Sequence, residues 1–114
     1  MSDCIFCKIV NKELPGQVVF ENDSVLVFKD INPVAPTHLL AIPKKHIANI
    51  CDPELLKDNL SVAMMEAIQK TALELGLEDN GFRVVVNRGL DAGEAVPHLH
   101  FHIISGRELN WPPG

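Results

Sequence analysis

The chain has 114 residues, of which 46% are hydrophobic, which suffices for one compact core and predicts a single domain over residues 1–114. Its formal net charge of -5 offers no basic surface for a nucleic-acid polymer, and no apolar stretch approaches the length of a membrane span. The start of the chain lacks the segments of an export signal and the cysteine count of three is odd, so we expect a soluble, cytoplasmic protein with reduced thiols or a metal site.

The first part of the chain predicts a short helix followed by a β-hairpin. Apolar residues recur at helical spacing over residues 4–11, and the sequence Leu14-Pro15-Gly16 ends that segment. Two β-rich runs, 17–21 and 25–29, flank Asn22-Asp23-Ser24, whose residue types are typical of tight turns. These two runs therefore predict an antiparallel hairpin.

The remaining chain predicts one long helix among further strands. Asp52-Pro53-Glu54 has the composition of a helix start, and an apolar stripe from Leu56 to Leu75 continues until Gly76. Further strands are predicted over residues 37–42, 81–87 and 97–105, with a glycine-containing loop over 88–96. A meander of strands with helices on one face is an α+β fold.

The last predicted strand alternates imidazoles with large apolar side chains. Because successive side chains of a strand point to opposite faces, His98, His100 and His102 share one face, roughly 6 to 7 Å apart, while the residues between them bury the other. Three interpretations follow: each ring has its own hydrogen-bond partner in the core, the rings bind a catalytic zinc ion, or the middle ring attacks phosphorus. Spacing alone does not separate the last two.

Several segments together resemble the histidine triad superfamily, and within it the Hint branch of purine nucleoside phosphoramidate hydrolases. The segments that carry this resemblance are His98-Leu99-His100-Phe101-His102-Ile103-Ile104, Cys4-Ile5-Phe6-Cys7-Lys8-Ile9, Phe28-Lys29-Asp30-Ile31, Ala35-Pro36-Thr37-His38, Ile42-Pro43-Lys44-Lys45-His46-Ile47, Val85-Val86-Asn87 and Trp111-Pro112-Pro113-Gly114. The resemblance implies a HIT-like α+β fold with an antiparallel sheet of about five strands, one long and one short helix, and a homodimer that continues the sheet. It also implies hydrolysis of a phosphorus–nitrogen bond through a nucleotidyl-histidine intermediate.

The resemblance assigns roles to individual residues. His100 would attack the α-phosphorus, His98 would orient His100, and His102 would contact the phosphate. His38 would lie beside the site, and Asp30 would accept the ribose hydroxyls. The remaining implied nucleotide contacts are Asn87, Gly93 and Ala95 at the phosphate, Ile5, Phe6, Ile9, Leu14, Phe28 and Ile31 at the purine, and Trp111 reaching the other subunit's site. The alternatives are a solvated turn for Asp30, a plain turn for Gly93, and ordinary core for the apolar residues.

The loop before the triad departs from the family pattern. Hint-like proteins commonly have Gly-Gly-Gln-Ser there, whereas this chain has Ala92-Gly93-Glu94-Ala95. Ala95 lacks a hydroxyl that could donate to the leaving group and retains only its backbone N–H. Glu94 adds a negative charge near the implied phosphate site, which disfavours anion binding unless the side chain points to solvent.

A separate hypothesis concerns metal binding. Cys4 and Cys7 have the C-x-x-C spacing at which two thiolates reach one zinc ion, and the resemblance implies His46 and His98 as the other ligands of a structural Cys2His2 site. The alternative is a helix with two cysteines and no ion. Cys51 has no partner at metal-binding spacing, and we expect it to be a plain packing residue.

Two other functions stay open at this point. A dinucleoside polyphosphate hydrolase would share the nucleotidyl-histidine chemistry but cleave a P–O–P bond. A non-catalytic module that binds a nucleotide or zinc would keep the fold without turnover, and Ala95 is compatible with that reading.

Overall fold

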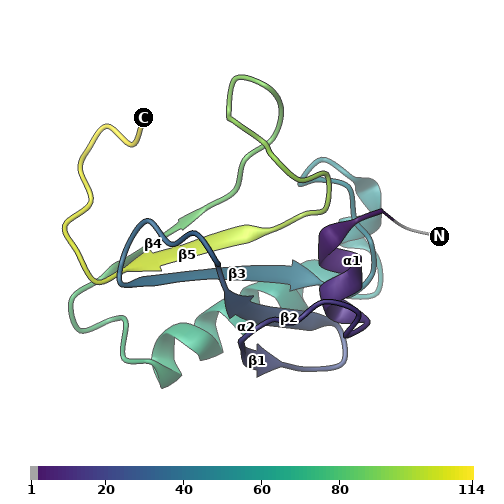
Figure 1. The fold of residues 1–114 in the computed structure, drawn as a ribbon, viewed down its shortest axis with the longest axis horizontal. Helices are drawn as coiled ribbons and strands as arrows, with labels where there is room; N and C mark the ends of the chain where they lie inside the picture. Colours follow the sequence, from purple (N-terminus) through teal and green to yellow (C-terminus); the bar gives the residue numbers. More distant parts are fainter. Residues whose placement is uncertain (1–2) are drawn as a thin grey trace.

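The computed structural model describes residues 3–114, which form a five-stranded antiparallel sheet with a helix on each face (Figure 1). The strands are β1 (Val18–Glu21), β2 (Val25–Lys29), β3 (Thr37–Pro43), β4 (Phe82–Val85) and β5 (Phe101–Ser105), in the order β1-β2-β3-β5-β4. The helices are α1 (Ile5–Val10), the short 3-10 helix η1 (Pro53–Leu56) and α2 (Leu60–Glu74). The predicted α+β class is confirmed. None of the helices in the described residues has the length and apolar character needed to cross a membrane.

Two apolar layers cover the two faces of the sheet. On one face α2 packs on alternate strand residues such as Val27, Leu39 and Ile103, and on the other α1 inserts Phe6 beside Phe28. The expectation that both helices lie on one face is therefore wrong. The physical reason is the continuous apolar run of β2, whose first four residues are all buried and need cover on both sides.

The hairpin of β1 and β2 forms as predicted, with its turn held by Asn22. The side-chain Oδ1 of Asn22 accepts hydrogen bonds from the backbone N–H groups of Ser24 at 2.9 Å and Val25 at 2.8 Å. This Asx-turn geometry is the reason that asparagine favours such positions.

The predicted long helix is interrupted near its start. Asp52 caps Glu54 at 2.9 Å as expected, but only η1 follows, and the chain passes through Asp58 and Asn59 with positive φ before α2 begins. The break changes which side chain faces the core, so Leu55 is 7% exposed and Leu56, which the stripe placed inside, is 77% exposed.

The histidine strand is shorter than predicted. β5 begins at Phe101 rather than at residue 97, so His98 and His100 precede the strand in an irregular segment. The predicted alternation nevertheless holds, because Leu99 and Ile103 are buried on the α2 side while the histidines lie on the other. The bend before β5 lets the His98 ring serve a different cluster from the other two.

Candidate active site and metal centre

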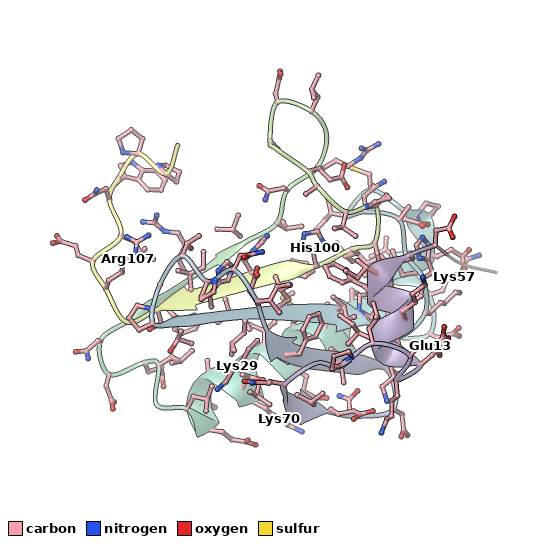
Figure 2. All side chains as sticks on the ribbon, viewed as in Figure 1. Glu13, Lys29, Lys57, Lys70, His100 and Arg107 are labelled. Atoms are coloured by element: carbon pink, nitrogen blue, oxygen red, sulfur yellow. The ribbon has the colours of Figure 1, made fainter. Side chains whose placement is uncertain are left out.

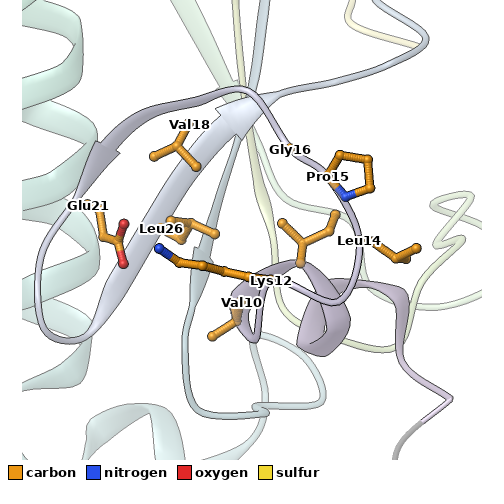
Figure 3. A pocket seen from close by; sticks show the side chains of 9 residues that line it. Val10, Lys12, Leu14, Pro15, Gly16, Val18, Glu21 and Leu26 are labelled. Carbon is orange, nitrogen blue, oxygen red and sulfur yellow. The ribbon is translucent and has the colours of Figure 1, made fainter.

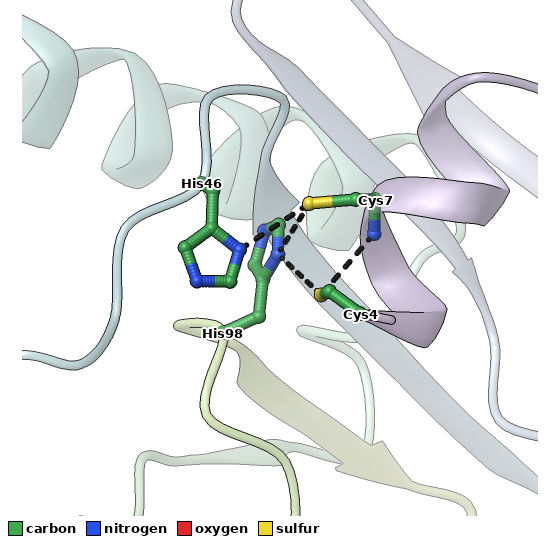
Figure 4. Close-up of side chains that lie close together, drawn as sticks. All are labelled: Cys4, Cys7, His46 and His98. Carbon is green, nitrogen blue, oxygen red and sulfur yellow. Dashed lines mark hydrogen bonds between the residues drawn. The ribbon is translucent and has the colours of Figure 1, made fainter. Parts of the chain in front are cut away.

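The N-terminal helix brings two cysteines to two histidines from distant segments (Figure 4). Cys4 caps α1 and Cys7 lies within it, whereas His46 follows β3 and His98 precedes β5. Cys4 Sγ lies 3.2 Å from His98 Nδ1, and Cys7 Sγ lies 3.3 Å from His46 Nδ1. The four ligand atoms lie within 4.8 Å of one another, so the structure brings together all four predicted zinc ligands.

The chemistry and spacing of these atoms fit a tetrahedral zinc ion. Bonds of about 2.3 Å to sulfur and about 2.0 Å to nitrogen place the two kinds of ligand roughly 3.5 Å apart. The observed separations from His98 Nδ1 are 3.2 Å to Cys4 Sγ and 3.6 Å to Cys7 Sγ. Two thiols and two imidazoles form a closed set of the structural kind, which leaves no position for a substrate. The cluster therefore favours a structural ion over a catalytic one.

The His98 ring is prepared for metal binding by a backbone group. Its Nε2–H donates to the carbonyl oxygen of Pro43 at 2.9 Å, which leaves the lone pair of Nδ1 facing the cysteines. Burial lowers the pKa of His98 to about 4, and the neighbouring His46 and His100 add to the effect. The ring is therefore neutral at pH 7, as a zinc ligand must be.

His100 is oriented by the backbone of His98, which is itself a member of the Cys4, Cys7, His46 and His98 cluster. Its Nδ1 lies 2.7 Å from the backbone oxygen of His98, and since a carbonyl only accepts, His100 carries its hydrogen on Nδ1. In the neutral ring the lone pair then lies on Nε2. The ring is buried and contacts the edge-on ring of Phe6 and the ring of His102, each at a centroid distance of 5.1 Å.

His38 and His102 form a hydrogen-bonded pair with an assigned direction. The backbone N–H of Val34 donates to Nδ1 of His38 at 3.1 Å, so the hydrogen of His38 is on Nε2. That Nε2 lies 2.8 Å from Nδ1 of His102 and donates to it. His102 therefore carries its own hydrogen on Nε2, the mirror image of the arrangement in His100.

Asp30 joins this pair through a longer contact. Its Oδ2 lies 3.4 Å from His38 Nε2, and its Oδ1 accepts the backbone N–H of Asn32 at 2.8 Å. The ligand atoms of Asp30, His38 and His102 also lie within 4.8 Å of one another. The 2.8 Å separation of the two ring nitrogens is nevertheless shorter than the roughly 3.3 Å between two nitrogens on one tetrahedral zinc, and it matches a hydrogen bond.

Burial also lowers the pKa of His102 to about 4, with His100 and His38 as further causes. The ring is thus neutral at pH 7. Its Nε2–H is available as a hydrogen-bond donor, while the lone pair of His100 is available as a nucleophile. The two adjacent rings therefore present opposite chemical functions.

The residues implied at the purine do not form one open slot. Phe6 and Phe28 are buried and pack edge to face at 5.8 Å, which is the ordinary-core alternative, whereas Ile31 is 86% exposed. Ile5 and Leu14 are partly exposed. A pocket of about 270 Å³ next to α1 does include two of these residues (Figure 3). Its lining comprises Ile9, Val10, Lys12, Leu14, Pro15, Gly16, Val18, Glu21 and Leu26.

The loop before the triad is closed by Glu94. Its Oε1 accepts the backbone N–H of Gly89 at 2.9 Å and is paired with Arg88 at 3.0 Å. These contacts, the Gly89 N–H first, lower the pKa of Glu94 and keep it ionised. The Glu94 carboxylate is thus turned toward its own loop and paired with a positive charge. These contacts were not predicted from the sequence.

The implied phosphate residues lie along the same loop. Asn87 is half-buried, whereas Gly93 and Ala95 are exposed. Gly93 has a φ of +77° and open space where a Cβ would lie, so the backbone conformation rather than a close approach requires glycine. Trp111 is exposed on the C-terminal tail. Its implied contact with the site of a second subunit stays a prediction.

The backbone partners of the histidines were not found by sequence reasoning. The carbonyl of Pro43 fixes the hydrogen position in the His98 ring, and the carbonyl of His98 fixes it in His100. The N–H of Val34 fixes it in His38 and, through His38, in His102. No signal in the sequence could have marked them, because every residue except proline offers the same two backbone groups.

Comparisons with known proteins identify the family of the chain. The HIT domain family model matches residues 11–109. A HIT family hydrolase from Legionella pneumophila has a TM-score of 0.92 and 46% identity, covering 98% of this chain and all of that chain (100%). A histidine triad nucleotide-binding protein from Candida albicans has a TM-score of 0.83 and 32% identity, covering 96% and 83% of the two chains.

A maize protein is similar to this chain along almost its whole length. This relative, named 14 kDa zinc-binding protein, from Zea mays, is 43% identical over 115 residues, covering 99% of this chain and 89% of its own length. The structure brings together the four predicted zinc ligands, and zinc binding is stated in the name of this relative. The family model spans most of the chain and the relatives align along almost its whole length, and the chain therefore belongs to the HIT domain family.

Proposed function

We propose that this protein is a purine nucleoside phosphoramidate hydrolase in which Nε2 of His100 attacks the α-phosphorus. The observation that carries the proposal is the hydrogen bond from His100 Nδ1 to the backbone oxygen of His98 at 2.7 Å. It leaves the lone pair of the buried ring on Nε2, as a nucleophile requires. The similarity to a HIT family hydrolase supports hydrolysis as the reaction class.

The reaction has two displacement steps. A bond forms between His100 Nε2 and phosphorus, the phosphorus–nitrogen bond breaks, and its electron pair leaves on the amine, which takes up a proton from solvent. Water then attacks the phosphorus and breaks the bond to Nε2, releasing the nucleoside monophosphate. While His100 carries positive charge in the intermediate, the carbonyl of His98 stabilises its Nδ1–H.

His102 donates a hydrogen bond from Nε2–H to the departing group in this proposal, and the ring stays neutral. Its neutral ring holds a hydrogen on Nε2, and its Nδ1 is already occupied by the Nε2–H of His38. The two rings therefore divide the work, one attacking and one donating to the phosphate or to the amine. Asp30, adjacent to His38, accepts the ribose hydroxyls, and Asn87 with the backbone near Gly93 and Ala95 binds the phosphate.

In this proposal the purine base binds to apolar residues near α1. Ile9 offers apolar surface on the α1 side of the sheet, where Phe6 and Phe28 form the floor rather than the walls, and the exposed Ile31 follows β2. Trp111 completes the site from the tail of a second subunit. An apolar platform of this kind suits the flat face of a purine.

We infer that Cys4, Cys7, His46 and His98 hold one zinc ion with a structural role. The converging ligands and the zinc-binding name of the maize relative support this inference. The ion would supply a cross-link between α1, the segment after β3 and the segment before β5. His98 would then serve twice, as a ligand through its ring and as the acceptor that orients His100 through its backbone.

We also infer a homodimer that continues the sheet. β4 is an edge strand with partly exposed Phe82 and Val84, and α2 exposes Val62, Met65 and Leu73 in addition to its buried stripe. Pairing of two such edges would cover both. Light scattering that gives the mass of a single 12.6 kDa chain at working concentrations would contradict this inference.

Release of nucleoside monophosphate from an adenosine phosphoramidate tests the main proposal, with a diadenosine polyphosphate assayed in parallel. We expect His100→Gly to abolish turnover and to retain nucleotide binding. His102→Asn should slow turnover yet still give a nucleotide-sized mass increase in quenched reactions, and this increase should be absent in His100→Gly. Turnover by His100→Gly would refute the nucleophile assignment, cleavage of the dinucleotide alone would favour the polyphosphate hydrolase, and cleavage of neither would favour a binding module.

A further inference from the structure

The start of the C-terminal tail lies against the loop that joins β2 to β3. Arg107 follows β5 by two residues (Figure 2). Its Nε donates to the backbone oxygen of Val34 at 2.9 Å. The preceding Gly106 has a φ of +101°, and a Cβ built there would lie 2.8 Å from Cβ of Pro36. Two successive tail residues thus hold the segment 34–36, and we name residues 106–107 the tail clamp.

The segment held by the tail clamp also supplies the hydrogen bond that orients His38. The N–H of Val34 donates to His38 Nδ1 at 3.1 Å, while the carbonyl of the same residue accepts from Arg107. Displacement of Val34 would therefore free Nδ1 of His38 to carry the ring hydrogen. His38 could then no longer donate from Nε2 to His102, and the tautomer of His102 would no longer be determined.

We propose that Arg107 is a positioning residue that acts through Val34 and His38 to keep the hydrogen of His102 on Nε2. The path consists of three consecutive hydrogen bonds, of 2.9, 3.1 and 2.8 Å, from the tail to the candidate active site. The catalytic consequence rests on the proposed function, whereas the tautomer of His102 does not depend on it.

The geometry of the Arg107 side chain suits this task. Its Nε binds the loop while its Nη1 donates to the backbone oxygen of Glu108 at 3.0 Å, so the guanidinium bridges loop and tail. The side chain is exposed, and its acceptors are neutral carbonyls rather than carboxylates. Its removal therefore leaves the apolar core intact and affects the position of the loop.

Arg83 provides a matched control on the same tail. Its Nη2 donates to the backbone oxygen of Asn110 at 3.1 Å and lies 3.5 Å from that of Leu109, so it anchors the tail to β4 rather than to the loop. Arg83→Ala should release the tail near Trp111 and leave Val34 in place. Arg107→Ala should release Val34. A general effect of tail mobility would appear in both variants.

The direct measurement is the tautomer of each ring in the zinc-loaded protein labelled with ¹⁵N at histidine. Two-bond correlations between ring nitrogens and carbon-bound protons distinguish a hydrogen on Nδ1 from one on Nε2. In the unchanged protein we expect Nε2–H for His38 and His102. In Arg107→Ala the His102 signals should become those of a mixture of tautomers, Arg107→Lys should restore part of the Nε2–H form, and Arg83→Ala should match the unchanged protein.

Kinetics supply the second readout. With a phosphoramidate of a basic alkylamine, whose departure depends most on the hydrogen bond from His102 Nε2–H, kcat of Arg107→Ala should fall roughly tenfold while KM changes less than about twofold. With an arylamine leaving group the loss should be smaller. A His102 ring that keeps Nε2–H in Arg107→Ala would overturn the inference, and so would an equal change in Arg83→Ala. Because the spectra need no substrate, they decide the inference even if the protein does not hydrolyse phosphoramidates.

Discussion

Withdrawal of zinc from the cluster of Cys4, Cys7, His46 and His98 should loosen α1 and destabilise the domain. The helix has 6 residues, which is too short to persist alone, and Phe6 is its only buried residue. Its attachment therefore depends on the packing of that ring and on the two cysteine ligands. The other two ligands lie in the segment after β3 and in the segment before β5, so a bound ion would join parts that are distant in sequence.

The size of the effect follows from linkage. A ligand that binds only the folded state stabilises it by about 2.7 kcal/mol when its free concentration is 100 times its dissociation constant. For a domain of this length each kcal/mol changes Tm by roughly 4 °C, so removal of zinc should lower Tm by about 10 °C. Loss of Phe6 packing against His100 should lower turnover at the same time.

Thermal unfolding with and without a chelator measures this effect, after elemental analysis of protein purified without added zinc. Cys7→Ser should reproduce the chelator's effect in untreated protein, and further chelator should then change little. Cys51→Ser is the control, because this third cysteine is exposed and belongs to neither candidate metal cluster of the described residues. A zinc content well below one equivalent, or a chelator-insensitive Tm, would refute the reasoning.

Three further measurements test other parts of the structure. The pKa of His102 is about 4 in the folded state and about 6.5 in the unfolded chain, so between these pH values only the unfolded chain binds the proton. The free energy of unfolding should therefore decrease by up to about 3 kcal/mol as pH falls through this window. Urea unfolding should show a weaker pH dependence in His102→Asn. Leu55→Ala should cost about 2 to 5 kcal/mol and Leu56→Ala less than about 0.5, and a larger loss for Leu56→Ala than for Leu55→Ala in urea unfolding would mean that the helix starts where the sequence pattern placed it. Gly93→Ala should cost about 1 kcal/mol through its φ of +77° without a steric clash, so a loss of several kcal/mol by the same assay would point to a close approach instead.

The elements that the sequence predicted correctly are those specified by local chemistry. The hairpin at Asn22, the apolar stripe of α2 and the alternation around Phe101 each depend on neighbours within a few residues. The errors arose where a distant segment decided the outcome. The late start of β5 accompanies hydrogen bonds of His98 and Leu99 to Pro43 and Ile47, which no local pattern records. The helix breaks at Asp58 and Asn59 through two positive φ values that the apolar stripe does not reveal.

The sequence by itself determined which residue types are available: three histidines on one face, a cysteine pair at metal-binding spacing and an acidic residue before β3. The tertiary structure decided how they are divided, turning the His98 ring to the cysteines and leaving His100 and His102 to face the candidate active site. It also decided which ring nitrogen carries hydrogen, through backbone groups of Pro43 and Val34. Backbone groups are the same in every residue except proline, so only their placement in space distinguishes the ones that orient a histidine.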